Sequence, residues 1–181
     1  MAEKFSAIIA NSLYDMNDLK KILIADDHNI VSKGLYYIIT SNFSDSIITE
    51  VNSISNLTRS LADNDFTHLI LDLNFDDGNA LEILPQIIER YPNLYILVYS
   101  MASETVFATK LLQYNISGFL SKSSTENEII AAMKVFFGGG VYINKQLNNE
   151  INNIEEENPA FSKNWAPKIF LKYNAWLRST K

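Results

Sequence analysis

The sequence predicts a doubly wound α/β fold in which five helices flank a five-stranded parallel sheet. Short runs of branched apolar residues, such as Ile22-Leu23-Ile24, are typical of buried parallel strands. They alternate with longer segments whose apolar residues recur with the spacing of one helix face. This alternation favours a single α/β domain, which we place at residues 20–140.

The strands are predicted from short, largely apolar runs, and the helices from periodic apolar residues and end signals. Thr125 and Glu128 form a capping box at the start of the last helix, and Pro92 ends the third. Asn115 is suited to close the fourth. The predicted strands are residues 21–26, 46–51, 68–73, 94–100 and 118–121, and the predicted helices are residues 29–40, 55–63, 79–91, 104–114 and 126–137.

The segments on either side of this domain differ from it in composition. Residues 1–19 are predicted to be an N-terminal extension, within which Met16 is a second candidate for the natural start. Residues 141–158 become rich in Asn and Glu and are predicted to be a linker. Residues 159–181 hold five basic residues, both tryptophans and no acid. This tail is typical either of an ill-ordered segment or of one that binds nucleic acid or a partner.

Composition restricts the class of protein. The net charge of −6 argues against a generally nucleic-acid-binding surface. The sequence has no cysteine, so it has no disulfide or thiolate metal site, and this fits a cytoplasmic protein. No apolar stretch approaches the roughly 20 residues that a membrane-spanning helix needs, so we expect no membrane association.

Acidic residues stand at the ends of two apolar runs. Asp26 ends the first predicted strand and Asp27 follows it, and Asp72 follows Leu69-Ile70-Leu71. Ligands of an open parallel sheet bind outside the carboxyl ends of its strands. Carboxylates that meet there repel one another unless they are protonated or bridged by a cation. The pattern therefore predicts a divalent metal site with an acidic side chain free for chemistry.

Two further polar residues are predicted at the same edge of the sheet. Ser100 ends the fourth strand, and Lys122 follows the fifth. A hydroxyl, an ammonium and a metal ion together stabilise negative charge on phosphoryl oxygens, so the set indicates phosphoryl transfer. Asp72 is the best candidate nucleophile, because aspartates form acyl phosphates.

These residues lie in four short motifs: Ile24-Ala25-Asp26-Asp27-His28, Leu71-Asp72-Leu73-Asn74, Tyr99-Ser100-Met101 and Ser117-Gly118-Phe119-Leu120-Ser121-Lys122. Each motif alone is weak, but their order and spacing resemble the receiver domain of two-component response regulators. More narrowly, the chain resembles the NarL/LuxR-type transcriptional regulators. The resemblance covers residues 21–144 and implies the flavodoxin-like receiver fold.

The resemblance implies a phosphoacceptor and a Mg²⁺ site. Asp72 would accept a phosphoryl group from a sensor histidine kinase. Asp26 and Asp27 would be the acidic pair that binds Mg²⁺, together with Asp72 and the backbone carbonyl of Asn74.

It also implies the parts of a switch. Ser100 would turn toward the phosphoryl group, and Lys122 would pair with the phosphoryl oxygens. Phe119 matches the aromatic switch position, three residues before the lysine. Homodimerisation on phosphorylation is a further family expectation.

The chain departs from the family pattern in several places, among them Phe119, which replaces the commoner tyrosine. Asp76 stands where the family usually has proline, and with Asp77 it adds charge next to the site. Ser123 replaces the usual proline after Lys122. The family continues with a helical DNA-binding domain, and residues 159–181 are too few for a helix-turn-helix. We therefore expect a truncated, frameshifted or lost output domain, with DNA bound only through that part.

Several functions stay open at this point. The leading hypothesis is a receiver that is not an enzyme and that regulates transcription through the largely missing output domain. A stand-alone receiver would act by protein–protein contacts instead, and a pseudo-receiver would only dock with partners. An aspartyl-phosphate phosphatase of similar fold is disfavoured, because Asn74 stands where such enzymes carry a second acid.

Overall fold

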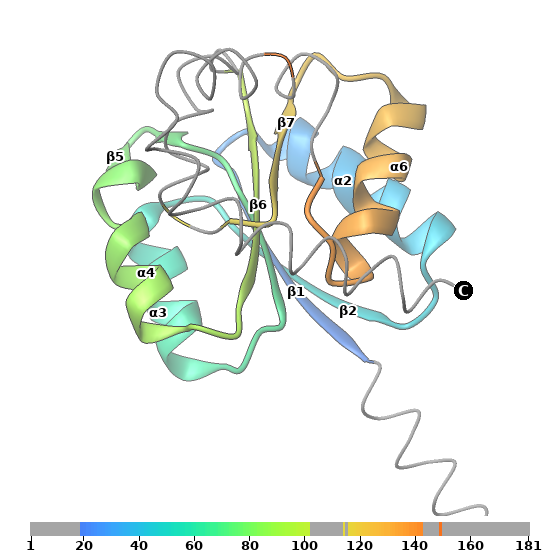
Figure 1. Cartoon of the computed structure of the whole chain (residues 1–181). Coiled ribbons are helices and arrows are strands. Elements are labelled where there is room, and N and C mark those ends of the chain that lie inside the picture. Colours follow the sequence, from blue (N-terminus) through green and yellow to red (C-terminus); the bar gives the residue numbers. More distant parts are fainter. Residues whose placement is uncertain (1–18, 102–113, 115, 143–148, 150–181) are drawn as a thin grey trace, which may run out of the picture.

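The computed structural model describes residues 19–101, 114, 116–142 and 149. Its five long strands form one parallel sheet of order β2-β1-β3-β6-β7 (Figure 1). The chain runs from β1 outward to β2 and then returns past β1 to β3, so the strand order reverses beside β1. Such a reversal opens a crevice at the carboxyl ends of the strands. The strands are Lys20–Ala25 (β1), Ser46–Val51 (β2), His68–Leu71 (β3), Tyr95–Ser100 (β6) and Gly118–Ser121 (β7).

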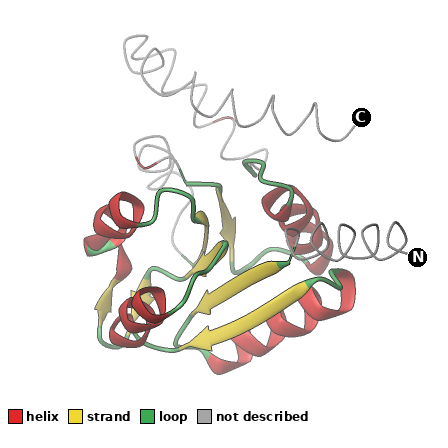
Figure 2. Cartoon of the chain, turned by 90° about the horizontal axis from the view of Figure 1, so that it is seen from below, coloured by secondary structure: helices red, strands yellow, loops and turns green. Residues whose placement is uncertain are grey.

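Helices cover both faces of the sheet, as Figures 1 and 2 show. Helices α2 (Asn29–Asn42) and α6 (Glu126–Phe137) lie on one face, and α3 (Ile54–Asp63) and α4 (Leu84–Arg90) lie on the other. The doubly wound fold predicted from the sequence is therefore confirmed. Among these described helices, none is long and apolar enough to span a membrane.

Part of the prediction lies outside the described residues. All of the predicted helix at 104–114 except Tyr114 falls there, as does Asn115. The same holds for nearly all of the predicted extension at 1–19, linker at 141–158 and tail at 159–181. The domain boundaries stay predictions.

Strand β1 separates two hydrophobic clusters. Leu23 and Ala25 pack into the cluster beneath α3 and α4, whereas Ile22 and Ile24 pack into the cluster beneath α2 and α6. All four side chains are fully buried. Burial on both faces explains why the strand reads as a continuous apolar run rather than as an alternating one.

The chief correction concerns the helix predicted at 79–91. Asn74–Phe75 (β4) and Gly78–Asn79 (β5) form a small antiparallel hairpin. A short 3₁₀ helix follows at Ala80–Glu82 (η1), and the α-helix begins only at Leu84. Pro85 has no N–H to donate to the preceding turn, so a continuous helix cannot run through this position.

The other predicted bounds agree closely with the structure. Ser46–Val51, Gly118–Ser121 and Glu126–Phe137 agree residue for residue, and the capping box of Thr125 and Glu128 is formed. The strand predicted at 68–73 ends earlier, at Leu71.

Glycine is required at position 118, where β7 begins. Gly118 has φ +147°, and a Cβ added there would lie 2.5 Å from the backbone oxygen of Tyr142. Gly34, within α2, would meet nothing within 4 Å. Replacement by alanine should therefore change the free energy of unfolding in opposite directions at the two glycines.

We expect Gly118→Ala to lower the free energy of unfolding by at least about 2 kcal/mol, through backbone strain and a forced shift. Gly34→Ala should raise it by about 0.5–1 kcal/mol, because alanine favours a helix interior. Urea unfolding of both variants checks this. Equal effects would contradict the described contact with Tyr142.

His68 is buried at the amino-terminal edge of the sheet, the edge away from the acidic residues. Its ring stacks on Tyr95 and meets Phe136 and Phe137 edge-on. Burial and the nearby Lys20 charge lower its pKa from 6.5 to about 4, offset only in part by the backbone of Phe136. The folded protein therefore disfavours a protonated His68.

This lowered pKa predicts a loss of stability in acid. Between pH 6.5 and 4 the unfolded chain binds a proton that the folded chain does not. The stabilisation that neutral His68 contributes is therefore fully present above pH 6.5. Below that pH the free energy of unfolding falls by about 1.4 kcal/mol per pH unit. The wild type should lose about 2 kcal/mol more than His68→Leu between pH 7 and 5, as measured by urea unfolding. Identical pH profiles would show that His68 is not buried in its neutral form.

Candidate functional site

The carboxyl ends of four strands bring the predicted site residues together. Asp26 directly follows β1 and Asp72 directly follows β3, and the last residues of these two strands are paired. Lys122 directly follows β7, whose last residue is paired with Ser100 of β6. The backbone N–H of Asp72 donates to Ala25 O (2.8 Å) and that of Lys122 to Ser100 O (3.0 Å), so the pairing extends into the site.

The Lys122 ammonium bridges two buried carboxylates. Its Nζ lies 2.7 Å from Asp26 Oδ2 and 2.7 Å from Asp72 Oδ2. The three side chains are only 6%, 2% and 3% exposed. Burial alone would lower the pKa of Lys122, but the contacts with Asp26 and Asp72 outweigh it and raise the pKa above its usual value. Lys122 is therefore charged and offsets part of the negative charge of the two aspartates.

His28 contacts two residues of the acidic cluster, Asp26 and Asp27. Its Nδ1 lies 2.7 Å from Asp27 Oδ1 and 3.2 Å from Asp26 Oδ1, and its backbone N–H donates to Asp26 Oδ1 (2.9 Å). The ring is 65% exposed. His28 was not among the predicted site residues, although its place directly after the acidic pair was a usable signal.

The acidic cluster has the donor set that Mg²⁺ requires. One potential ligand atom from each of Asp26, Asp27, His28 and Asp72 lies within 4.8 Å of the others. Asp26 Oδ2 and Asp27 Oδ1 are buried, and each contacts the nitrogen of a basic side chain, Lys122 Nζ or His28 Nδ1, at 2.7 Å. Carboxylate oxygens in this state are suited to a hard divalent cation. The residues present therefore fit the ion that the fold family implies.

The hairpin after β3 separates the two acids that were predicted to add charge to the site. Asp76 is exposed, and its backbone N–H donates to Asp27 Oδ2 (2.8 Å). The Asp77 carboxylate instead accepts the N–H of Ile54 (3.0 Å) and of Ser55 (3.3 Å), at the start of α3. The hydrogen bond from Ile54 is the main cause that holds the pKa of Asp77 below its usual value. The Asp77 carboxylate is thus bound to the start of α3.

The remaining predicted residues are in place, and their roles stay predictions. Ser100 and Phe119 are fully buried at 0% exposure, and Phe119 belongs to the cluster beneath α3 and α4. Asn74 begins β4, and its side-chain Oδ1 accepts from Asn79 Nδ2 (3.3 Å). Ser123, which replaces the usual proline, donates its backbone N–H to Ser121 Oγ (3.2 Å).

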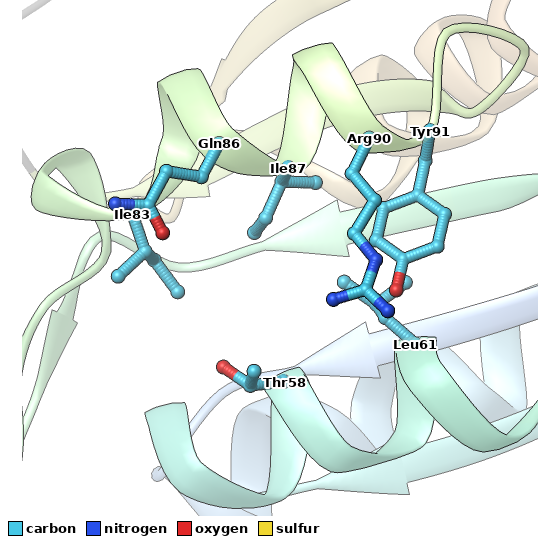
Figure 3. Close-up of a pocket in the computed structure, with 7 residues that line it drawn as sticks. All are labelled: Thr58, Leu61, Ile83, Gln86, Ile87, Arg90 and Tyr91. Carbon is cyan, nitrogen blue, oxygen red and sulfur yellow. The ribbon is translucent and has the colours of Figure 1, made fainter.

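A separate pocket of about 160 Å³ lies between α3 and α4 (Figure 3). In the close-up, Arg90 and Tyr91 extend from the end of α4 toward Leu61 of α3. None of its lining residues is a predicted site residue. They are Thr58, Leu61, Ile83, Gln86, Ile87, Arg90 and Tyr91.

Replacing the bridging lysine tests the electrostatics of the site. Lys122→Met leaves the Asp26 and Asp72 carboxylates buried without their cation, which should lower the free energy of unfolding by about 3 kcal/mol at pH 7. Millimolar Mg²⁺ should restore part of this loss. The control is Lys134→Met on the exposed side of α6, and both are measured by urea unfolding. Equal stability of the two variants would show that the Lys122 ion pairs with Asp26 and Asp72 do not stabilise the fold.

Residues 22–134 match the response regulator receiver domain family. The transcriptional regulatory protein DegU of Brevibacillus brevis is 25% identical over 131 residues, which cover 72% of this chain and 56% of DegU. The oxygen regulatory protein NreC of Staphylococcus carnosus is 26% identical over 137 residues, which cover 74% of this chain and 62% of NreC. The chain therefore spans somewhat more than half the length of these relatives.

Solved structures show the same fold. The isolated REC domain of RcsB from Salmonella enterica serovar Typhimurium, determined with the phosphomimetic BeF₃⁻, has a TM-score of 0.66 and 21% identity. The match covers 73% of this chain and 98% of that one. A two-component response regulator of the LuxR family from Aurantimonas sp. SI85-9A1 has a TM-score of 0.65 and 22% identity, with 75% and 97% covered. With its family match, its sheet order and the residues at its strand ends, this chain belongs to the response regulator receiver domain family.

Proposed function

We propose that the chain is a phosphorylation-dependent signalling receiver in which Asp72 accepts a phosphoryl group from a sensor histidine kinase. One observation carries the proposal: the charged Lys122 Nζ lies 2.7 Å from the carboxylate of Asp72, inside a buried cluster of three aspartates. An ammonium at that distance stands ready to neutralise oxygens added to the carboxylate.

The transfer requires only one bond exchange. A carboxylate oxygen of Asp72 forms a bond to phosphorus as the P–N bond of the kinase phosphohistidine breaks, and the bonding pair stays on the imidazole nitrogen. Lys122 then exchanges its contact with the carboxylate for contacts with phosphoryl oxygens. The product is an acyl phosphate on Asp72.

Mg²⁺ would be held by Asp26, Asp27, Asp72 and the backbone carbonyl of Asn74. When bound, it supplies positive charge to the phosphoryl oxygens as negative charge develops on them. The three aspartates each place one potential ligand atom within 4.8 Å of the others, and this supports the assignment.

The readout would begin at Ser100 and Phe119. Both are fully buried near the carboxyl ends of β6 and β7, the strands next to Asp72 and Lys122. In this proposal the Ser100 hydroxyl turns toward the phosphoryl group, and Phe119 repacks in response. Phosphorylation of Asp72 at the carboxyl edge of the sheet would thereby change the protein surface next to β6 and β7.

The response would be regulation of transcription, with homodimerisation on phosphorylation. DegU is described as a transcriptional regulatory protein, and RcsB has been solved as two dimers bound to DNA, which supports this reading by similarity. DNA contact would come through an output domain. The alternative is a receiver that signals by protein–protein contacts alone. Neither form is an enzyme in this proposal, because Asn74 replaces the second acid that hydrolytic turnover needs.

Phosphorylation tests the proposal directly. Incubation with acetyl phosphate and Mg²⁺ should add one phosphoryl group to the intact protein, observed by mass spectrometry. Asp72→Asn should abolish the added mass, whereas Asp65→Asn, an exposed aspartate away from the site, should retain it. Removing Mg²⁺ with EDTA should reduce the modification of the wild type by at least about tenfold.

Two outcomes would refute the assignment. The first is equal modification of Asp72→Asn and wild type. The second is sustained multiple-turnover hydrolysis of a phosphomonoester, which would favour the phosphatase.

A further inference from the structure

We propose that Asp77 is a positioning residue for the metal site: it anchors the β4–β5 hairpin to α3 and so holds the Asp76 N–H against Asp27. The inference rests on the proposed function, because it concerns the Mg²⁺ that the transfer requires. It assigns a role to an acid that touches neither the metal ligands nor the phosphoacceptor.

The first step is the contact with α3. Both carboxylate oxygens of Asp77 are occupied there: Oδ1 accepts the Ile54 N–H (3.0 Å), and Oδ2 accepts the Ser55 N–H (3.3 Å) and Oγ–H (3.4 Å). The first N–H groups of a helix have no partner within the helix and favour an anion. The tip of the hairpin is therefore bound to a fixed element.

The second step is the contact with the acidic cluster. The N–H of Asp76 donates to Asp27 Oδ2 at 2.8 Å. Asp27 is largely buried, and its other oxygen, Oδ1, lies 2.7 Å from His28 Nδ1. Fixing Oδ2 fixes the direction in which Oδ1 points, as outer partners do for metal ligands. Asp76 and Asp77 are adjacent, so an anchor on one restrains the other.

Packing leaves the hairpin little freedom to move away from α3. Phe75 is buried at 7% exposure, in the same cluster against which Ile54 packs. Gly78 has φ +149°, and a Cβ added there would lie 3.1 Å from Ile54 Cδ1. Asn74, whose carbonyl is an expected ligand, begins the same hairpin. The Asp77 anchor thus acts on two metal ligands at once.

The experiment compares the Mg²⁺ affinity of the wild type and four variants by isothermal titration calorimetry with MgCl₂. Asp77→Ala should weaken binding by about tenfold, the smaller end of the effect expected for an outer partner. Asp77→Asn should recover part of the loss, because its amide oxygen still accepts from Ile54. Asp76→Asn removes a charge at the neighbouring position but keeps the Asp76 N–H, so it controls for charge alone.

Ser53→Ala controls for the stability of α3. The Ser53 side chain accepts from the Asn56 N–H (3.1 Å), so this variant removes a cap from the same helix end without touching the hairpin. Ser53→Ala should keep the wild-type Mg²⁺ affinity. Amide hydrogen exchange at Asp76 should become faster in Asp77→Ala, less so in Asp77→Asn, and should not change in Ser53→Ala.

Each other outcome would overturn the inference in its own way. Equal affinity of Asp77→Ala and wild type would show that the anchor does not reach the metal. A tenfold loss in Asp76→Asn would assign the effect to charge, and the same loss in Ser53→Ala would assign it to helix stability. A wild type that binds no Mg²⁺ would overturn the proposed function and this inference together.

Discussion

The ion pair that Lys122 makes with Asp26 and Asp72 is the constraint on which the site depends. Two carboxylates at 2% and 3% exposure are costly to bury unless a cation accompanies them, and Lys122 supplies it at 2.7 Å from each. The same ammonium contacts the carboxylate of Asp72, the proposed phosphoacceptor. In the proposed function, phosphorylation of Asp72 would redistribute the charge around which the site is organised.

The sheet topology produces this contact from residues far apart in sequence. β1 and β3 are direct neighbours, so the residues that follow them, Asp26 and Asp72, meet at one edge. β6 and β7 continue the sheet and bring Ser100 and Lys122 to that edge. Because both faces are covered by helices, the carboxyl edge is where polar groups can meet a ligand. The family match over residues 22–134 is consistent with this reasoning from topology.

Sequence patterns predict this part of the molecule well, because a strand end is a local signal. Asp26, Asp72, Ser100 and Lys122 each stand where an apolar run stops, and the structure brings them to one edge. The hairpin at 74–79 was missed because its cause is not local. The helical period of the following apolar residues was extended back through Pro85, and the Asp77 contact with Ile54 joins residues 23 positions apart. His28 follows the acidic pair, but its contacts with Asp26 and Asp27 depend on side-chain geometry that the sequence does not show.

A crystal structure of the protein grown with Mg²⁺ and beryllofluoride tests the central claim most directly. The account predicts a beryllofluoride adduct on the Asp72 carboxylate, with Lys122 Nζ contacting fluoride and Mg²⁺ bound by Asp26, Asp27, Asp72 and the Asn74 carbonyl. An unmodified Asp72 that still contacts Lys122, with Mg²⁺ absent or bound elsewhere, would contradict it.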